Sequence, residues 1–386
     1  MLSIVMGSNA MRGGLLSLLL GTLLFVPLEA RAQTWTWTSA DVDLEGYGTS
    51  IQSDHDGNLH LSYYAPSGGF VKYAFLPAGE SKWYKMSIDQ NLGVLETGLT
   101  LDAAGNPHIC YTPREIRYAH FDGHKWTKQE VDSGSGLIAY ICSIQVTPSG
   151  KPMMSWYLES GTYLRFAILE GGAWMAQSIQ GGQGNYPGKW TSIALDGRGF
   201  PRISYSDFPI GQLKYASFDG KIWTTSLVDV PETSSQGGQR GMGNSLILDA
   251  QGQPMICYYD EQSLKMARYL EGHWQKETIE QLPNFGRWSW KNFRSSLVLD
   301  SKGNPHIGFE SIQGLEHAWW DGNKWRTQLI VTSLGSPFYE NAMTIDKNDV
   351  LYISYRDPGD GTLRIAIGRA ASGQPPAGAQ KVISPS

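Results

Sequence analysis

Residues 192–229, SIALDGRGFPRISYSDFPIGQLKYASFDGKIWTTSLVD, contain the repeating unit that decides the fold. Four short runs rich in β-branched and aromatic residues are separated by Gly, Pro and Asp, as is typical of strands joined by tight turns. The first turn is DGRG at 196–199 and the third is DG at 219–220; Asp caps such turns and Gly supplies their positive φ. We expect strands at 192–195, 202–205, 213–218 and 223–228.

The same unit occurs seven times along the chain. Its first turn supplies an anchor residue, and successive anchors lie 45 to 53 residues apart. The anchors are Gly57, Gly105, Gly150, Gly199, Gly252, Gly303 and Asp349. A period of about 40–50 residues with four strands in each unit is typical of a β-propeller. We therefore predict an all-β fold, a seven-bladed β-propeller of four-stranded antiparallel blades.

Further positions repeat in the same frame. A small residue lies five positions after each anchor, where neighbouring blades would approach closely: Ser62, Cys110, Ser155, Ser204, Cys257, Gly308 and Ser354. A tryptophan opens the fourth strand in six copies: Trp83, Trp126, Trp174, Trp223, Trp274 and Trp325. The seventh copy ends after its third strand. We predict that an N-terminal strand carrying Trp37, with Trp35 as the alternative register, completes that blade and covers its open edge.

The two ends of the chain differ from the repeats. Arg12, an apolar run at 15–26 and the small-x-small pattern Ala30-Arg31-Ala32 predict a secretory signal peptide over residues 1–32. The propeller then covers 33–370, and a tail rich in Gly, Pro, Ala and Ser, predicted to be disordered, covers 371–386. We expect a secreted or periplasmic monomer with no membrane insertion. A net charge of −5 gives no overall attraction to nucleic acid.

The cysteines and the repeated histidines favour structural interpretations. Cys110 and Cys257 occupy the small-residue position, so we expect them and Cys142 to be buried thiols, the alternative being a disulfide in an exported protein. His60, His108 and His306 share one repeat position on three separate blades, which favours packing or hydrogen bonding beside the first turn. We predict no metal site, and no nucleotide, flavin or haem motif is present.

Function is expected on the face that carries the second turns and the connections between blades. Those connections are long and dissimilar, and variable loops on a rigid scaffold commonly carry binding or chemistry. Aromatic faces stack on sugar rings, and arginine forks bind carboxylates or sulfates. The candidate ligand-binding residues in these connections are Tyr186, Trp190, Arg240, Arg287, Trp288, Trp290 and Arg294.

Acidic residues recur at the second turn, on the same face. They are Glu159, Asp207, Asp260, Glu310 and Asp357. Repetition in blade after blade favours turn capping, whereas a pair of carboxylates acting in glycoside cleavage is the alternative. Asp260 and Glu310 flank the basic and aromatic connection, so we add both to the candidate site.

One hairpin carries a family resemblance. Residues 217–223, SFDGKIW, resemble the Asp-box (BNR) hairpin of sialidase-like propellers, whose form is Ser-x-Asp-x-Gly-x-x-Trp, although the copy here is one residue shorter. Asp122-Gly123 with Trp126, and Asp321-Gly322 with Trp325, repeat its second half. The resemblance implies a carbohydrate-active or carbohydrate-binding propeller in which the Asp-box is structural. The Phe/Tyr-Arg-Ile-Pro motif of sialidases is missing from the sequence.

Three functions follow from these observations. The first is a secreted propeller that binds a carbohydrate, an anionic glycan in particular, through its long-loop face. The second is a glycan-cleaving enzyme, a hydrolase or a lyase, in which Arg240, Arg287 or Arg294 holds a carboxylate and Tyr259, Tyr339 or an acid transfers a proton. The third is a scaffold for a protein partner. The aromatic and basic residues favour glycan binding, and no catalytic residue is assigned.

Overall fold

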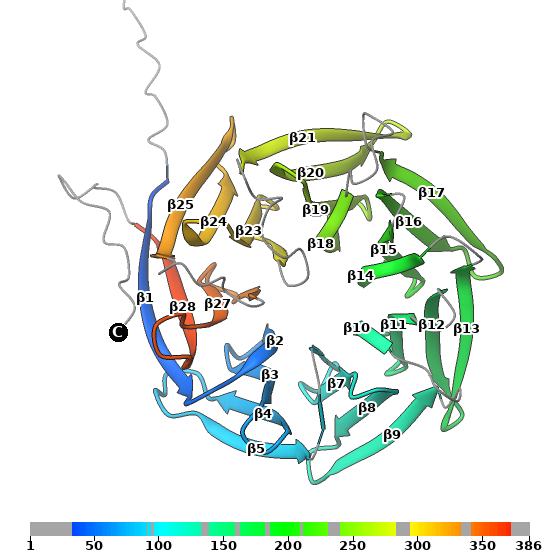
Figure 1. Cartoon of the computed structure of the whole chain (residues 1–386), viewed down its shortest axis with the longest axis horizontal. Coiled ribbons are helices and arrows are strands. Elements are labelled where there is room, and N and C mark those ends of the chain that lie inside the picture. Colours follow the sequence, from blue (N-terminus) through cyan, green and yellow to red (C-terminus); the bar gives the residue numbers. More distant parts are fainter. Residues whose placement is uncertain are drawn as a thin grey trace, which may run out of the picture. The chain divides into compact units, whose positions relative to one another are not determined.

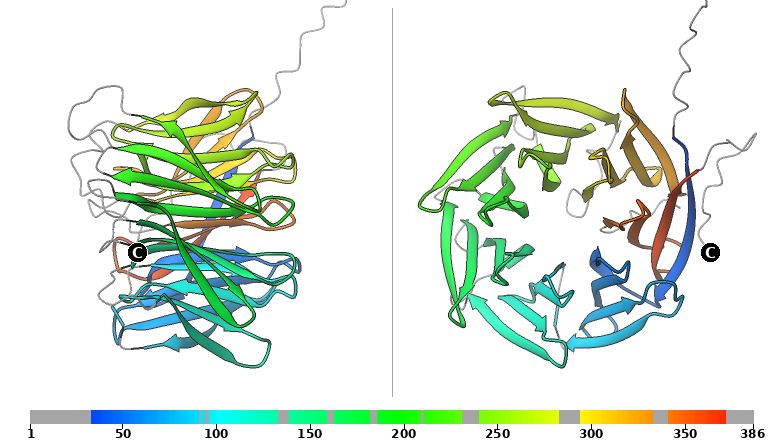
Figure 2. Two further views of the ribbon diagram at one scale, coloured as in Figure 1. Left: turned by 90° about the vertical axis from the view of Figure 1, so that its right-hand side faces the viewer. Right: turned by 180° about the vertical axis from the view of Figure 1, so that it is seen from behind.

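The protein is a seven-bladed β-propeller (Figure 1). The computed structural model describes residues 33–90, 92–93, 96–132, 139–158, 163–181, 186–208, 211–230, 240–282, 294–332 and 341–371. Within residues 33–371 the sheets are arranged as a ring, and the first strand of each blade lies at its centre (Figures 1 and 2). Among the described residues, no helix has the length and apolar character needed to cross a bilayer.

Six blades each use four consecutive strands, as the repeat predicts. Blade 1 contains β2 (Tyr47–Ser53), β3 (Leu59–Ala65), β4 (Phe70–Leu76) and β5 (Tyr84–Asp89). Blade 2 contains β6 (Thr97–Leu101), β7 (Pro107–Tyr111), β8 (Ile116–Phe121) and β9 (Trp126–Asp132). Blade 3 contains β10 (Ala139–Val146), β11 (Pro152–Leu158), β12 (Tyr163–Glu170) and β13 (Ala173–Gly181). Blade 4 contains β14 (Tyr186–Leu195), β15 (Pro201–Phe208), β16 (Gln212–Phe218) and β17 (Trp223–Asp229). Blade 5 contains β18 (Arg240–Leu248), β19 (Pro254–Asp260), β20 (Ser263–Leu270) and β21 (His273–Gln281). Blade 6 contains β22 (Ser295–Leu299), β23 (Pro305–Glu310), β24 (Gly314–Trp320) and β25 (Trp325–Thr332).

Blade 7 joins the two ends of the propeller. It contains β26 (Ala342–Ile345), β27 (Leu351–Arg356) and β28 (Leu363–Ala370), with β1 (Trp35–Asp43) as its outer strand. Ser39 faces Ala366 across β1 and β28, just as Thr225 faces Ala216 in blade 4. Trp37 lies two residues before Ser39, as Trp223 lies two residues before Thr225. Trp37 therefore occupies the position of the other fourth-strand tryptophans, and the predicted register with Trp37 is confirmed.

The first turns are closed as the sequence predicts. In blade 1, Asp54 Oδ1 accepts hydrogen bonds from the backbone amides of Asp56 and Asn58, both at 2.9 Å. The anchor glycines have φ between 76° and 89°, and Asp349 takes the same left-handed conformation at 58°. The third turns of the Asp-box-like hairpins are capped similarly, since Asp219 Oδ1 accepts the amides of Lys221 and Ile222. These carboxylates are therefore occupied in holding the turns.

A belt of serine hydroxyls joins the innermost strands. We call the residue that opens the first turn of each blade its first-turn residue: Asp54, Asp102, Thr147, Asp196, Asp249, Asp300 and Asp346. The serine four positions before it accepts a backbone N–H from the next blade: Leu99 to Ser50, Ile193 to Ser143, Leu246 to Ser192, Leu297 to Ser245 and Met343 to Ser296, at 2.9–3.2 Å. Each bond gives a partner to an inner-strand amide that has none within its own sheet. The belt therefore fixes the spacing of neighbouring blades around the channel.

The small-residue position faces the next blade in a second set of contacts. Ser62 with Thr97, Ser155 with Thr191, and Ser354 with Thr49 are hydroxyl pairs at 2.8 Å, and the Cys257 thiol donates to Ser295 at 3.1 Å. At the same place between blades 2 and 3, Cys110 and Cys142 form a disulfide with a Cα–Cα distance of 6.2 Å.

The expectation of three free thiols is therefore wrong for Cys110 and Cys142 and confirmed for Cys257, which is buried and free. The physical reason is that Cys142 lies five residues before its first-turn residue, where blade packing points it at the small-residue position of blade 2. Burial raises the pKa of the Cys257 thiol to about 12, which keeps it protonated at neutral pH.

A third inter-blade contact lies farther from the axis. Tyr63 donates to Asp43 at 2.6 Å, and Lys72 and Lys85 pair with the same carboxylate at 3.0 and 2.9 Å. Asp89 and Asp229, each at the end of a fourth strand, hold a tyrosine and a lysine of the following blade in the same way. Burial opposes ionisation of Asp43, but these donors prevail and hold its pKa well below the ordinary value.

The repeated histidines have the hydrogen-bonding role that the sequence predicts. Nδ1 of His60 lies 2.7 Å from the Tyr73 hydroxyl, and Nδ1 of His108 lies 2.6 Å from that of Tyr118. In blade 6 the partner of His306 is another histidine, His317, at 3.0 Å. All three repeated histidines are buried against the first turn of their blade.

Candidate functional site

The innermost strands enclose a central cavity of about 350 Å³. It is lined by residues of β2, β6, β10, β14, β18, β22 and β26, most of them Ser, Thr, Asn or small apolar residues. Its size is within the range of small-molecule sites, roughly 300–1,000 Å³. We call this cavity the channel. We call Glu96, Trp190, Arg294 and Asn341 the channel mouth, since each lies five or six residues before the first turn of its blade.

Arg294 is the one charged residue among the described residues that line the channel. Its guanidinium forms an ion pair with Glu96, which is 5% exposed and comes from blade 2. Arg294 belongs to blade 6, so this pair joins two blades that are not neighbours in the ring. A buried carboxylate of this kind costs several kcal/mol of solvation unless a cation pairs with it. The pair therefore both ties the mouth together and holds a guanidinium at its edge.

The backbone around Arg294 is held by a buried tyrosine. The Tyr259 hydroxyl accepts a hydrogen bond from the Glu310 amide at 2.8 Å. It can donate one to the carbonyl oxygen of Arg294 or of Glu310, each 3.1 Å away. Burial, followed by the charge of Glu310, raises the pKa of Tyr259 well above its ordinary value. Tyr259 therefore positions β22 against β23 and is too firmly protonated to serve as a base at neutral pH.

Glu310 is also part of this support. Its Oε1 accepts the backbone amide of Asn341 at 3.1 Å, and the Asn341 side chain donates to the Arg294 carbonyl at 2.9 Å. Glu310 is 1% exposed. The arrangement links blades 6 and 7 at the channel mouth and orients Asn341 toward the channel that it lines.

Trp190 lies at the channel mouth in a strained backbone conformation. Its φ is +50°, beside an irregularity in the pairing of β14 with β15, and Ile141 has φ +48° at the equivalent position of blade 3. Blades 1 and 5 place Gly48 and Gly243 there, at +62° and +52°. A non-glycine residue in this region costs on the order of 1–3 kcal/mol, and such strain clusters at functional sites.

The indole of Trp190 is part of the channel wall and does not present an exposed face on which a sugar ring could stack. It is 8% exposed and packs in a cluster with Met242 and Tyr259 while lining the channel. Its carbonyl accepts the Asn244 side-chain amide. Trp190 therefore forms part of the channel lining, as Arg294 does.

The other predicted ligand-binding residues divide into two groups. Tyr186 and Arg240 begin β14 and β18, the innermost strands of two blades, and their side chains are outside the described structure. Arg287, Trp288 and Trp290 lie wholly outside the described residues. The structure thus places Trp190, Arg294 and Glu310 at or beside one mouth, and the roles predicted for Tyr186, Arg240, Arg287, Trp288 and Trp290 stay predictions.

Of the repeated acids, Asp260 and Asp357 cap their turns, whereas Asp207 pairs with Lys214, Glu310 contacts Asn341, and Glu159 lies outside the described residues. Asp260 Oδ1 accepts the Gln262 amide and the Ser263 hydroxyl, and its other oxygen pairs with Lys265 at 2.9 Å. Burial would raise the pKa of Asp260, but these partners hold it below the ordinary value. Asp357 accepts the Gly359 amide and pairs with Arg364. The turn-capping interpretation is confirmed for both, and Asp260 lies in its own turn rather than at the mouth.

Sequence reasoning missed Glu96 and Asn341. Both have a signal in the repeat frame, since Glu96 lies six residues before Asp102, as Arg294 does before Asp300 and Trp190 before Asp196. Aligning the copies on the first-turn residue would have brought these three onto one ring. The candidates named from the sequence lie close together within single connections, whereas this ring contains one residue from each of several blades.

Comparison with known proteins gives the fold. No protein-family model matches the chain, and no curated protein matches it. Among solved structures it is similar to an ulvan lyase of a new polysaccharide lyase family, PL25, bound to -[GlcA(1-4)Rha3S]-. The TM-score is 0.59 at 12% identity, over 86% of this chain and 95% of that chain.

Two further structures have the same general likeness. YCF48 bound to a D1 peptide has a TM-score of 0.54 at 10% identity, covering 88% of this chain and 97% of that one. A protein of unknown function from Dyadobacter fermentans DSM 18053 has a TM-score of 0.53 at 10% identity, covering 87% and 99%. Identities this low show the propeller fold alone. Membership of the Asp-box family stays a prediction.

Proposed function

We propose that this chain is an exported β-propeller that binds an anionic glycan at the channel mouth. The observation that carries the proposal is Arg294, the single charged side chain that lines an otherwise neutral, polar channel among the described residues. A guanidinium at the edge of such a cavity recognises carboxylates and sulfates through paired hydrogen bonds.

The ion pair with Glu96 limits how strongly Arg294 can bind an anionic ligand. While Glu96 is ionised, it competes with any anionic ligand for the Arg294 guanidinium. A ligand carboxylate or sulfate would take over some of these N–H donors, and Asn341 beside them would supply a further donor or acceptor for a hydroxyl group. The strained Trp190 backbone supports the same location, since it is retained at the mouth where two other blades use glycine.

Export is supported by the disulfide between Cys110 and Cys142. Disulfides persist in oxidising compartments and are rare in the cytosol. Together with the signal-peptide pattern at residues 1–32, this favours a secreted or periplasmic protein.

Binding is favoured over cleavage by the state of three candidates for proton transfer, Asp260, Glu310 and Tyr259; a fourth, Tyr339, lies outside the described residues. Asp260 is held in its turn by Lys265, Glu310 contacts Asn341, and the Tyr259 hydroxyl contacts backbone groups. None of the three is presented to the channel as a free general acid or base. Glycan cleavage is the second candidate because the PL25 neighbour is a lyase bound to a uronate and sulfated rhamnose unit.

The test is to probe an array of uronate-containing and sulfated oligosaccharides, with neutral counterparts, using residues 33–386. We expect acidic glycans to bind and neutral ones not to. In Arg294→Gln/Glu96→Gln, which removes both charges and leaves no uncompensated carboxylate, affinity should fall about 10- to 100-fold, the usual value of a charged hydrogen bond. Glu96→Gln alone should bind more tightly, because Arg294 loses its internal counter-ion.

Arg198→Gln is the matched control, since it removes one exposed guanidinium from a first turn on the opposite face. Binding that is unchanged in the double variant, or equal for neutral and acidic glycans, would overturn the proposal. Incubation with the bound oligosaccharide separates the enzyme candidate, because new reducing ends or unsaturated uronates would show cleavage. Failure to bind any glycan would leave the protein-scaffold alternative, to be tested by pull-down.

A further inference from the structure

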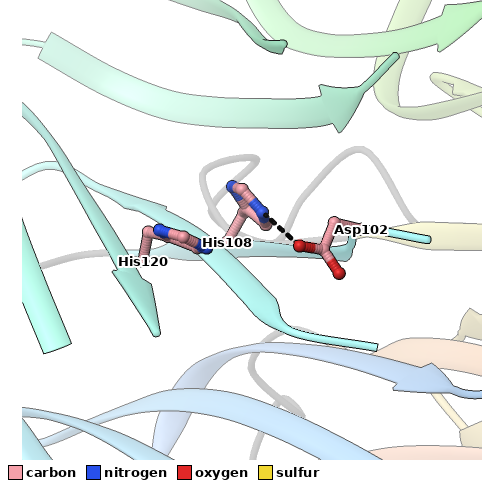
Figure 3. Close-up of side chains that lie close together, drawn as sticks. All are labelled: Asp102, His108 and His120. Atoms are coloured by element: carbon pink, nitrogen blue, oxygen red, sulfur yellow. Dashed lines mark ion pairs between the residues drawn. The ribbon is translucent and has the colours of Figure 1, made fainter. Parts of the chain in front are cut away.

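We propose that blade 2 contains a binding site for a divalent transition metal of the zinc class, formed by Asp102, His108 and His120 (Figure 3). It is independent of the channel mouth. Asp102 follows β6 directly and Glu96 precedes it, so the two sites lie at opposite ends of the same strand. The three residues come from the β6–β7 turn, β7 and β8.

The geometry brings three ligand atoms to one point. One atom from each side chain lies within 4.8 Å of the other two, and His108 Nε2 lies 3.6 Å from Asp102 Oδ2. In a tetrahedral zinc site with bonds near 2.0–2.1 Å, the ligand atoms are roughly 3.4 Å apart. To hold an ion, the ligand atoms would close from as much as 4.8 Å to about this distance, and the stacked imidazole rings would turn until both Nε2 lone pairs meet it. Two imidazoles and one carboxylate are ordinary zinc ligands, and water would take the fourth position.

The two imidazoles present nitrogen atoms that lack hydrogen-bond partners. Nε2 of His108 and Nε2 of His120 are both buried and neither makes a hydrogen bond with the described residues. His108 is 3% exposed, and Figure 3 shows its ring directed at the Asp102 carboxylate with the His120 ring beside it. The rings stack with centroids 4.1 Å apart. A buried, unpaired polar atom is costly, and a metal ion would satisfy both at once.

Neighbouring groups hold these ligands in place. The Tyr118 hydroxyl lies 2.6 Å from His108 Nδ1. In the tautomer whose Nδ1–H donates a hydrogen bond to this hydroxyl, the Nε2 lone pair faces Asp102. Asp102 is fixed by the amides of Ala104 and Asn106, both at 2.9 Å, and by the Asn106 side chain at 3.0 Å. Outer partners of this kind orient metal ligands and raise their affinity.

The repeat provides an internal comparison. Blade 1 has the same Asp and His, Asp54 and His60, with a tyrosine on Nδ1, but Phe75 replaces His120. There His60 Nε2 lies 3.3 Å from Asp54, close enough for a direct hydrogen bond. The separation itself does not distinguish blade 2, since Asp300 and His306 of blade 6 lie 3.7 Å apart with Trp319 opposite His306. The additional imidazole of His120 does distinguish it, because among these three blades it alone offers a cation a third ligand.

The experiment measures metal uptake by the intact chain. Protein freed of metal by a chelator is dialysed against Zn²⁺ and its metal content determined, and Co²⁺ serves as a spectroscopic probe of nitrogen and oxygen coordination. We expect one equivalent to bind and the melting temperature to rise with Zn²⁺, since a ligand that binds only the folded state stabilises it. His120→Phe, which copies blade 1 and preserves the packing, should weaken binding at least 100-fold. Asp102→Asn should weaken it at least 10-fold.

Two variants keep the result interpretable. His124→Gln removes an exposed histidine from the adjacent β8–β9 turn and should leave uptake unchanged. Phe75→His recreates the third ligand in blade 1 and should add a second equivalent. The proposal is overturned if the chain takes up no stoichiometric metal, or if His120→Phe and Asp102→Asn bind as much as the parent while His124→Gln binds less.

Discussion

At the scale of single residues, the buried histidines of blade 6 make stability depend on pH. His306 and His317 stack with ring centroids 5.2 Å apart, among the rings of Trp35, Trp37 and Trp319. Burial, and then the charge that His306 would carry, lower the pKa of His317 well below its ordinary value. Burial also lowers that of His306, opposed by Asp300, whose Oδ2 lies 3.7 Å away, and by Asp349.

We predict that the free energy of unfolding falls as the pH drops below about 6.5, the ordinary histidine value. Below that pH the histidines of the unfolded chain bind protons, whereas the buried ones of the folded chain stay neutral. The free energy of unfolding then falls by about 1.4 kcal/mol per pH unit for each histidine that stays neutral. His317→Met, which copies Met266 of blade 5, should make the slope between pH 7 and 5 shallower by about that amount. Urea denaturation at several pH values measures it, with exposed His55→Met as the control. Equal slopes for parent and His317→Met would refute the assignment.

At the scale of strands, different pairs of side chains can form the same contact between neighbouring blades. A hydroxyl pair, a thiol with a hydroxyl, and a disulfide occupy equivalent places between different blades. We therefore predict that Ser295→Cys forms a disulfide with Cys257 and joins β19 to β22. The two residues are 38 positions apart, and closing a loop of that size should stabilise the fold by about 3–4 kcal/mol.

Thiol titration and peptide mapping under oxidising conditions test for this bond, and chemical denaturation measures its effect. Ser296→Cys is the matched control, since the neighbouring Ser296 hydroxyl accepts an amide of blade 7. A variant that keeps two titratable thiols after oxidation would show that the place is not equivalent to that of Cys110 and Cys142.

The same strands show how far the sequence could lead. Turns are local, so the recurring turn residues predicted seven first turns with Asp349 as the seventh anchor, and the structure places Asp349 in the left-handed region. The disulfide was missed because the facing of Cys110 and Cys142 depends on packing between blades, which the period alone does not reveal. The position of Glu96 is visible in the repeat frame, but its pairing with Arg294 across the channel is not. Trp190 was identified by its loop, yet its burial follows from Met242 and Tyr259, which no local pattern joins to it.

At the scale of the whole molecule, the ring is closed by β1 beside β28. The Ala371 amide donates to the Thr34 carbonyl at 2.8 Å, and Trp35 faces Ala370. β1 also brings Trp35 and Trp37 into a buried cluster and pairs Asp41 with Arg364. The third and fourth strands are joined by turns of two to four residues in blades 2 to 6 and by residues 77–83 in blade 1, so blade 7 lacks only that covalent link.

We predict that a circular permutant folds if residues 33–44 are moved to follow residue 371 through a short Asp-Gly linker, with the new start at residue 45. The cut falls beside Leu44, which is 86% exposed, so no buried contact is lost. Its melting temperature should lie within a few degrees of the parent's. Deletion of 33–43 should instead expose the edge of β28 and cause aggregation. If the permutant aggregates like the deletion, or the deletion melts like the parent, then closure by β1 does not hold the ring together.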